Sequence, residues 1–508
     1  MSKLFTTAQL KASDAYTIIH EPITSTRLIE RAAMACVERL LNFENLEMNF
    51  EGRVYHIFCG RGNNGADGFA MALEFVGLCS DMHIYYDKDA IRNGENAVML
   101  ERLYPTFSVY IHPFQPDMKI IPAGNRDIII DAVLGTGLTN EATGIEKEMI
   151  SWINNSRLPV VSIDIPSGLP ADPDIPFGEV VKADLTLTLQ TMKRSFLYPE
   201  TGAFCGKIEV LPIGLHKQFE IETSSNEYLI DQTSVQQHYK KRAAFSHKGT
   251  FGHALMFAGS HGKMGASVLS TRACVKSGAG LVSVLIPENG NNIMQIAVPE
   301  AMTIIYDNTI ALPDVEKFDA IGIGCGLGTD KIAKNIVLHV LEHCQKPILL
   351  DADALNCISQ HPEWLQKIPV NSLLTPHPKE FERLFGESAN AFERNQLQIR
   401  MSTEHKIFIL LKGRYTCIST PSGECWFNIT GNPGMATGGS GDVLSGLISG
   451  LYAQYKDMFK AAILGVYLHG LAGDLAAEDL SEEALIASDI IDHIGAAYRQ
   501  TFYATPLI

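Results

Sequence analysis

Short apolar runs rich in β-branched and aromatic residues alternate with helix-length segments along most of this 508-residue chain. Such alternation predicts mostly parallel sheets covered by helices, because helical crossovers join parallel strands. In the first stretch the runs lie at residues 54–59, 83–86, 127–132, 160–165 and 185–189. In the second stretch they lie at residues 253–258, 281–286, 320–324, 347–350, 372–375 and 407–411. The predicted fold class is therefore α/β, with doubly wound sheets.

The chain length and a break in this rhythm predict two domains. A chain of 508 residues is too long for a single hydrophobic core. The alternation stops between about residues 215 and 248, where the chain becomes polar. We predict a Rossmann-like three-layer domain at residues 1–215, a linker at 216–225 and a second α/β domain at 226–508. No short repeat relates the two halves, which indicates a fusion of different domains.

Composition excludes several classes of protein. The net charge of -16 argues against a sequence-independent nucleic-acid surface, which needs a basic field. The ten cysteines lie far apart without a C-x-x-C pair, which favours free thiols in a reducing compartment over disulfides or structural zinc. The chain starts without an apolar signal core, and its most apolar late stretch is too short to span a bilayer. We expect a cytoplasmic protein with no nucleic-acid or membrane partner.

A glycine-rich segment, Asn432–Asp442, precedes an apolar, helix-like run near the end of the chain. Glycines allow a ligand to approach the backbone, and the N–H groups that open a helix bind anions. The carboxylate of Asp442 can take a proton from a hydroxyl that lies beside a phosphate. The segment predicts a phosphate site with its own base, and the alternative is a turn that Asp442 merely caps.

Other predicted strands of the second half also end in polar or glycine-containing turns, so these turns can share one sheet edge. The chain has no G-x-x-x-x-G-K-[ST] motif, which argues against a P-loop, so a nucleotide would bind at the late glycine turn and at Lys412. Each candidate has a simpler alternative. His377 can be an ordinary loop histidine, Asp351 and Asp353 can cap a helix, and Lys412 can be a solvated charge.

The first half contains a turn that satisfies G-x-G-x-x-G, Gly60 to Gly65, with Asp87 farther along the chain. A Rossmann dinucleotide site is therefore one interpretation. Asn63, Asn64 and Asp67 do not belong to that fingerprint, and their amide and carboxylate groups can bind ribose hydroxyls or a cation.

Two further strand ends of the first half carry an aspartate, at Asp131 and Asp164. Because ligands gather outside the carboxyl ends of parallel strands, these turns and the one at Asn64 can converge on one pocket. There Asn64, Asp131 and Ser167 would bind a monovalent cation, while Asp164 would transfer protons. The alternative is that both aspartates only form turns.

Residues from about 7 to 215 resemble the NAD(P)H-hydrate epimerase family. Its N-N-G-x-D-G, D-x-x-x-G-T-G and D-I-P-S-G turns occur here in order, with Ala66 where glycine is common. The resemblance implies that Asn64, Asp131 and Ser167 bind K⁺. It also implies that the hydrate contacts Asn63, Asn64, Gly65, Ala66, Asp67, Gly135, Thr136, Gly137, Leu138, Thr139, Asn140, Glu141 and Asp164.

Residues from about 226 to the end resemble the NAD(P)H-hydrate dehydratase family, which has a ribokinase-like fold. The D-A-D-A-L-N, T-P-H-P-x-E and G-N-x-G-M-A-x-G-G-x-G-D motifs occur in order. The resemblance implies that Ala266, Gly328, His377 and Asp442 contact the hydrate. It implies ADP binding by Lys412, Gly413, Arg414, Tyr415, Thr416 and Gly441, although Arg414 and Tyr415 replace smaller residues. Mg²⁺ is expected to bridge the nucleotide oxygens.

Taken together, the chain resembles the bifunctional NAD(P)H-hydrate repair enzymes of bacteria. The resemblance implies two small-molecule substrates, NADHX and NADPHX, in which water has added to the nicotinamide ring. The second domain would use ADP to dehydrate the S form, giving NAD(P)H, AMP and phosphate, with Asp442 as the base. The first domain would interconvert the R and S forms with Asp164 as its acid or base, and a homo-oligomer is expected.

Three other hypotheses for the function of the chain are compatible with parts of the sequence. A ribokinase-type small-molecule kinase would explain the turn that ends at Asp442 but not the first domain. An oxidoreductase built on the first glycine turn would leave the second half without a role. A first domain that only binds a partner or a lipid carrier would tolerate substitution of Asp131 and Asp164.

Overall fold

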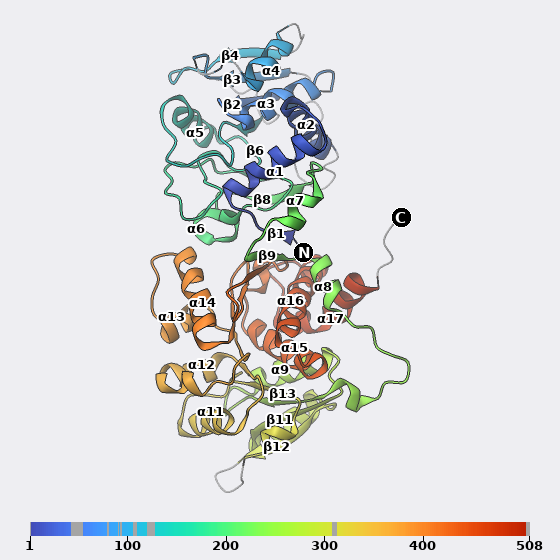
Figure 1. Ribbon diagram of the computed structural model, residues 1–508. Coiled ribbons are helices and arrows are strands. Elements are labelled where there is room, and N and C mark those ends of the chain that lie inside the picture. The colour runs from blue at the N-terminus through green and yellow to red at the C-terminus, as the bar shows by residue number, and fades with distance from the viewer. Residues whose placement is uncertain are drawn as a thin grey trace. The chain divides into compact units, whose positions relative to one another are not determined.

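The computed structural model describes residues 2–41, 54–78, 81–89, 91, 94–104, 109–118, 127–306 and 312–503. The chain divides into two compact units, Lys3–Ser225 and Met1–Ser2 with Asn226–Ile508 (Figure 1). Residues 216–225, for which the sequence suggests a linker, lie within the first unit and include helix α7 (Lys217–Glu222). The doubly wound α/β class predicted from the alternation is confirmed in both units.

The N-terminal unit is built on a seven-stranded sheet in which all paired strands are parallel. In spatial order the strands are β4 (Val109–Pro113), β3 (Asp81–Tyr86), β2 (Val54–Cys59), β5 (Asp127–Ala132), β6 (Val160–Ile163), β7 (Leu185–Leu189) and β8 (Lys207–Leu211). The two edge strands, β4 and β8, were not among the predicted runs. Both are partly exposed and mix polar with apolar residues, so they lack the continuous apolar signal of the buried strands.

Helices cover both faces of this sheet, as a three-layer sandwich requires. The helices of the unit are α1 (Thr7–His20), α2 (Ser25–Leu41), α3 (Asn63–Glu74), α4 (Glu95–Leu103), α5 (Gly144–Ser156), α6 (Pro199–Gly202) and α7. Apolar residues of α2, α3 and α4 pack on one face, with Ile57, Ile84 and Ile130 at the centre of that core. Helix α5 packs on the other face through Met149 and Ile150.

The C-terminal unit has an eleven-stranded sheet, which is parallel from β12 to β16 and antiparallel through the β16–β17–β18 meander. In spatial order the strands are β1 (Ser2–Lys3), β9 (Glu227–Ile230), β18 (Cys425–Asn428), β17 (Cys417–Ser419), β16 (Phe408–Leu411), β15 (Leu373–Leu374), β14 (Leu349–Leu350), β13 (Ala320–Ile323), β10 (His253–Phe257), β11 (Leu281–Pro287) and β12 (Met302–Tyr306). Strand β16 matches the predicted run at residues 407–411, whereas β9, β12, β17 and β18 were not predicted.

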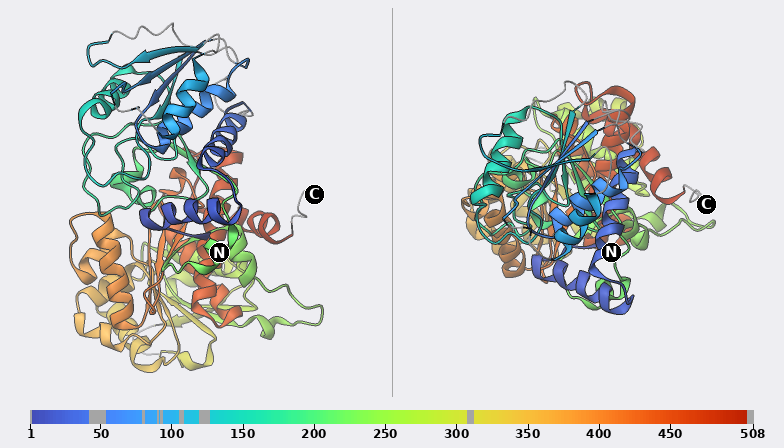
Figure 2. Two further views of the ribbon diagram at one scale, coloured as in Figure 1. Left: turned by 45° about the horizontal axis from the view of Figure 1, so that its top comes forward. Right: turned by 90° about the horizontal axis from the view of Figure 1, so that it is seen from above.

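Two groups of helices enclose this second sheet, as Figures 1 and 2 show. One face is covered by α8 (Gln232–His238), α9 (Met264–Lys276), α10 (Asn291–Ala297), α15 (Ser440–Tyr455), α16 (Met458–Leu480) and α17 (Ala487–Phe502). The other face is covered by α11 (Lys331–His343), α12 (Ala352–Ser359), α13 (Pro378–Phe385) and α14 (Ala391–His405).

Close helix packing fixes the position of α15, the helix that follows the glycine-rich segment. A Cβ atom added at Gly446 would lie 1.9 Å from the carbonyl oxygen of Ser270 in α9. A Cβ atom added at Gly450 would lie 2.0 Å from the hydroxyl of Ser277. Only glycine permits this approach, so these two positions allow α15 to pack closely against α9.

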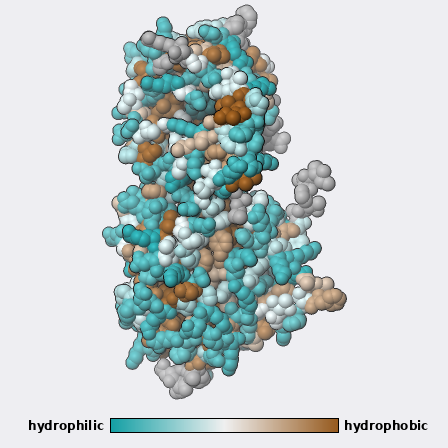
Figure 3. All heavy atoms as spheres, viewed as in Figure 1, coloured by the Kyte–Doolittle hydropathy of each residue, from teal (hydrophilic) through white to brown (hydrophobic). Residues whose placement is uncertain are grey.

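Hydrophilic residues predominate on the face drawn in Figure 3, where apolar residues form small separate groups. Within the described residues, no helix combines the length and apolar character needed to cross a membrane. The nine cysteines that the structure describes are buried and free.

Candidate functional site

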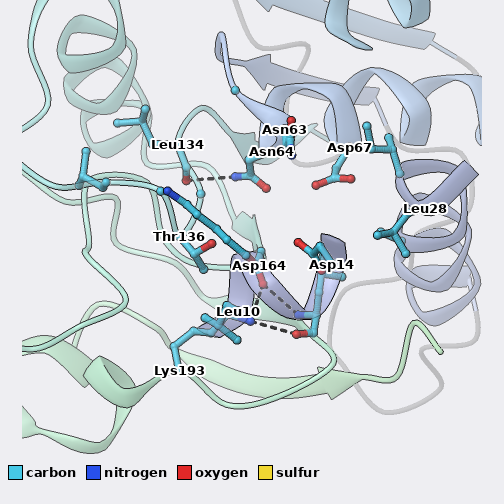
Figure 4. Close-up of a pocket in the computed structure, with 18 of the residues that line it drawn as sticks. Leu10, Asp14, Leu28, Asn63, Asn64, Asp67, Leu134, Thr136, Asp164 and Lys193 are labelled. Carbon is cyan, nitrogen blue, oxygen red and sulfur yellow. Dashed lines mark hydrogen bonds and ion pairs between the residues drawn. The ribbon is translucent and has the colours of Figure 1, made fainter. Parts of the chain in front are cut away.

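The N-terminal unit contains a cavity of about 530 Å³ beside the turns that follow β2, β5 and β6 (Figure 4). Parallel pairing brings these turns together, because it places the carboxyl ends of the strands along one edge. The predicted residues that line the cavity are Asn63, Asn64, Asp67, Gly135, Thr136, Gly137, Leu138, Thr139, Asn140, Glu141 and Asp164. Gly65 and Ala66 do not line it. A Cβ atom at Gly65 would lie 2.0 Å from the carbonyl oxygen of Gly60, so this glycine permits the tight turn.

The three predicted cation ligands, Asn64, Asp131 and Ser167, meet around the backbone of Leu134. Asn64 Nδ2 donates to the Leu134 carbonyl oxygen at 3.1 Å, and the Leu134 N–H donates to Ser167 Oγ at 2.8 Å. Ser167 in turn donates to the Asp131 carboxylate from both its hydroxyl and its backbone N–H. These residues therefore form one connected cluster under the cavity.

Two groups of this cluster, one amide oxygen and one carboxylate, are suitable ligands for a cation. The Asn64 Oδ1 atom is buried and has no hydrogen-bond partner within the described residues. The Asp131 carboxylate is fully buried and accepts hydrogen bonds from hydroxyl and backbone donors, including Ser162 Oγ at 2.7 Å. Burial raises the pKa of Asp131, and the hydrogen bonds from Ser167 and Ser162 oppose that rise. A monovalent cation held by oxygen ligands would satisfy Asn64 and offset the buried charge.

Asp164, the predicted acid or base, is held by an ion pair that the sequence did not indicate. Its carboxylate lies 2.7 Å from Lys193 Nζ and accepts a hydrogen bond from the Leu189 N–H at 3.1 Å. The Lys193 ammonium is almost completely buried and also donates to the carbonyl oxygens of Leu189 and Thr191. Asp164 itself has a φ of 66°, an uncommon conformation for a non-glycine residue that often marks a functional position.

Helices α1 and α2 close the cavity with residues that no motif indicated. Their apolar contribution includes Leu10, Ile18, Leu28, Ile29 and Ala32. Helix α1 also contributes Asp14, a carboxyl that points into the same cavity as Asp164 (Figure 4). Burial, followed by the nearby Asp164 charge, raises the pKa of Asp14 to about 6.

The C-terminal unit has its own cavity, of about 680 Å³, between the β16–β17 turn and the glycine-rich segment. The predicted nucleotide and hydrate residues that line it are Lys412, Gly413, Arg414, Thr416, Gly441 and His377. Tyr415 and Asp442 are not part of this lining, although Asp442 directly follows Gly441. His377 also caps α13, because its Nδ1 accepts the Glu380 N–H at 3.3 Å, so it has the ordinary loop role as well as a place at the cavity.

Asp442 stands beside a buried ion pair. Lys412 Nζ lies 2.8 Å from Asp351 Oδ1, and Ser445 of α15 donates to the other oxygen of Asp351. Burial, followed by repulsion from Asp351, raises the pKa of Asp442 to about 6, while a hydrogen bond from the Cys325 thiol and the Lys412 charge oppose the rise. Lys412 is thus not a solvated surface charge. Asp351 precedes α12 without making a side-chain cap, so capping is not its role.

Ala266 and Gly328, the other two predicted hydrate contacts, lie near the turn that contains Cys325. The Gly328 N–H donates to Asp353 Oδ2 at 2.8 Å, and the same oxygen lies 3.1 Å from Lys263 Nζ. A Cβ atom at Gly326 would come within 2.8 Å of the Ala266 Cβ. Neither Ala266 nor Gly328 lines the 680 Å³ cavity, and the Cys325 thiol connects their turn to Asp442.

Helix α16 holds both ends of the glycine-rich segment, through residues whose only sequence signal was that they interrupt an apolar run. His469 Nε2 lies 3.0 Å from the Ser440 carbonyl oxygen, and burial lowers the pKa of His469 to about 4, so the neutral ring donates this bond. Asp474 accepts hydrogen bonds from the Gly431 N–H at 2.9 Å and from Asn432 Nδ2 at 3.0 Å. These contacts fix the segment against the helix.

Two family profiles match the chain. One, described as NAD(P)H-hydrate dehydratase, matches residues 254–495, and the other, described as YjeF-related protein N-terminus, matches residues 25–195. Among solved structures, a ribokinase-like superfamily protein from Enterococcus faecalis is 31% identical, with a TM-score of 0.50 over 56% of this chain and 99% of its own. An ADP/ATP-dependent NAD(P)H-hydrate dehydratase from Bacillus subtilis, co-crystallised with ATP/Mg²⁺, is 31% identical with a TM-score of 0.48 over 55% of this chain and 100% of its own.

Full-length relatives match both units together. The bifunctional NAD(P)H-hydrate repair enzyme of Moorella thermoacetica is 32% identical across 98% of this chain and 96% of its own length. The enzyme of the same name from Coxiella burnetii is 33% identical across 87% of this chain and 90% of its own. With this identity across nearly the full length, the chain belongs to the family of bifunctional NAD(P)H-hydrate repair enzymes.

Proposed function

We propose that this chain restores hydrated nicotinamide cofactors through two activities, one in each unit. The N-terminal unit, residues 3–225, epimerises the R and S hydrates of NADH and NADPH. The C-terminal unit, residues 226–508, dehydrates the S hydrate with ADP as the phosphoryl donor. Because only one epimer is dehydrated, the epimerase allows the other epimer to be recovered as well.

The observation that carries this proposal is the position of Asp442 beside the Lys412–Asp351 ion pair, at the start of α15. A carboxyl with a pKa of about 6 is largely ionised at neutral pH and can accept a proton from the C6 hydroxyl of the hydrate. The hydroxyl oxygen then attacks the β-phosphorus of ADP, and AMP leaves. Loss of phosphate from C6 together with a proton from C5 restores the C5–C6 double bond.

The remaining parts of the C-terminal site would bind the nucleotide. The turn at residues 412–416 forms one wall of the cavity, which all of its residues except Tyr415 line, and Gly441 lies at the other wall. Lys412 Nζ would be 3.4 Å from a Cβ at Gly441, so a phosphate at the start of α15 would meet both the ammonium and the helix amides. Mg²⁺ bound together with the nucleotide would offset the negative charge of its phosphates.

In the N-terminal unit, Asp164 would exchange protons with the hydrate. The residues from Asn63 to Asp67 and the loop from Gly135 to Glu141 would bind the substrate around it. Asn64, Asp131 and Ser167 would hold K⁺ below the cavity, where it would supply a fixed positive charge. The orphaned Asn64 oxygen supports this assignment.

The first test is the recovery of NAD(P)H absorbance at 340 nm from a mixture of R and S hydrates, with ADP, Mg²⁺ and K⁺. We expect rapid recovery of the whole signal, because the epimerase feeds the dehydratase. Rapid recovery of only the part of the absorbance that comes from the S hydrate would contradict the epimerase assignment. Absence of recovery with either ADP or ATP would contradict repair altogether and favour a small-molecule kinase.

Asp442→Asn should lower the rate of S-hydrate dehydration by about 10²- to 10⁴-fold, because the general base is lost. In the unsubstituted chain the rate should rise as pH increases through about 6, since only the ionised Asp442 carboxylate accepts a proton. This limb should disappear in the variant. Asp479→Asn, at an exposed position of α16, is the control and should retain the full rate and the limb. A full rate in D442N would rule out the assigned base.

K⁺ should stabilise the N-terminal unit independently of catalysis. A ligand at 100 times its Kd that binds only the folded state adds about 2.7 kcal/mol of stability. We therefore expect the melting temperature of the unit to rise in KCl relative to tetramethylammonium chloride at equal ionic strength. Asn64→Ala should abolish that difference, whereas Asn155→Ala, an exposed amide of the same unit, should retain it. Equal K⁺ responses in both variants would contradict the site.

Asp474→Asn should raise the KM for ADP by about tenfold, because it weakens charge-assisted hydrogen bonds to Gly431 and Asn432 that hold the glycine-rich segment. Steady-state kinetics of S-hydrate dehydration at varied ADP measures the effect. The exposed Asp479→Asn variant on the same helix should leave the KM unchanged. A KM within twofold of the unsubstituted chain in D474N would show that the segment does not depend on this carboxylate.

A further inference from the structure

The epimerase cavity contains a carboxyl that none of the sequence motifs includes. Asp14 lies on α1, outside the turns that follow the strands, yet it lines the same cavity as Asp164 and Lys193. Figure 4 shows its side chain pointing into this space, with Asp164 and Lys193 around it. The motif residues alone therefore do not account for all the ionisable groups that a substrate would meet.

The charges around Asp14 come from several elements. Asp164 and Lys193 follow β6 and β7 and form an ion pair, and Asp67 lies on α3. Other charged groups at the cavity are Lys11 on α1, Glu141 in the loop after β5, and Arg61 after β2, which pairs with Glu146. The lining contribution of α2 is Ser25, Leu28, Ile29 and Ala32, which carry no charge.

The two carboxyls have different surroundings. Asp164 forms an ion pair with the Lys193 ammonium at 2.7 Å. Asp14 is mostly buried, and burial followed by the Asp164 charge raises its pKa to about 6, with Lys193 opposing. Burial and the same neighbours, Asp164 and Asp14, raise the pKa of Asp67 as well. Neighbouring carboxyls in such different environments typically act as an acid and a base.

Epimerisation at C6 needs both an acid and a base, whichever bond breaks. If the C6–O bond breaks, an acid protonates the departing oxygen, the N1 lone pair forms an iminium, and a base takes a proton from the water that adds to the other face. If the ring opens, a base removes the hydroxyl proton, the N1–C6 electron pair moves to nitrogen, and an acid protonates N1. Closure reverses these transfers, so no other reactant is consumed.

We propose that Asp14 is a second catalytic carboxyl of the epimerase, which donates a proton to the hydrate while the Lys193-paired Asp164 accepts one. The proposal rests on the epimerase function assigned above to this unit. It places the proton donor on α1 and the acceptor at the end of β6, so that the reacting ring would lie between a helix and the sheet edge.

Asp14→Asn tests the proposal in the full-length chain. Conversion of R to S hydrate without ADP is followed by chromatography, after the uncatalysed rate has been subtracted. We expect kcat to fall by about 10²- to 10⁴-fold. In the unsubstituted chain, kcat/KM should decrease as pH rises through about 6, because the protonated donor is lost. D14N should lose this limb, and the conservative Asp14→Glu should recover part of the rate.

Two controls separate the possible outcomes. ADP-dependent recovery of the S hydrate by the other unit shows that each variant is folded and equally concentrated. Asp174→Asn, an exposed carboxyl of the same unit, should epimerise normally. If the unsubstituted chain does not interconvert the hydrates, the proposed epimerase function itself fails.

If the unsubstituted chain epimerises and D14N keeps its rate within twofold, the role of Asp14 is overturned while the function stands. A raised KM with an intact pH limb would also overturn it, because that result shows binding without proton transfer. Loss of the limb in Asp67→Asn but not in D14N would assign the proton donor to Asp67 instead.

Discussion

Parallel strand pairing is the constraint on which both candidate sites depend. It aligns the carboxyl ends of neighbouring strands, so turns that are far apart in the chain meet at one edge of each sheet. In the N-terminal unit this alignment brings together the turns after β2, β5 and β6, which provide Asn64, Asp131 and Asp164. In the C-terminal unit, β14 and β16 lie on either side of β15 and run parallel to it. Their carboxyl ends therefore bring Asp351 within reach of Lys412.

Both sites keep carboxylates away from water, but they compensate the charge in different ways. Asp131 accepts hydrogen bonds from hydroxyl and backbone donors, whereas Asp351 and Asp164 each have a lysine. Among the residues that the structure describes, no lysine forms an ion pair with Asp442 or Asp14, and burial raises the pKa of each to about 6. A pKa of about 6 makes Asp442 and Asp14 groups that can exchange protons near neutral pH.

Local sequence signals predicted the sheet core and the turns after β2, β5 and β6 that line the N-terminal cavity. The buried strands consist mostly of apolar residues, and the glycine turns require close backbone approach. The strands β2 and β5 and the Asn432–Asp442 segment could therefore be recognised without a structure. The edge strands β4 and β8 were missed because polar residues interrupt their apolar runs. The segment at 216–225 looked like a linker because it is polar, yet it contains the short amphipathic helix α7, whose Phe219 is buried.

The sequence by itself determined the α/β class, the family and the residues that follow each strand, because these depend on short-range patterns of apolar, glycine and acidic residues. Only the tertiary structure decided which charges meet. Lys193 reaches Asp164, and Lys412 pairs with Asp351. Asp14 enters the N-terminal cavity from α1, a helix that precedes every strand of that sheet in the chain. Such contacts join residues that are far apart in the chain, and the packing of helices on the sheet, which no local pattern encodes, sets their distances.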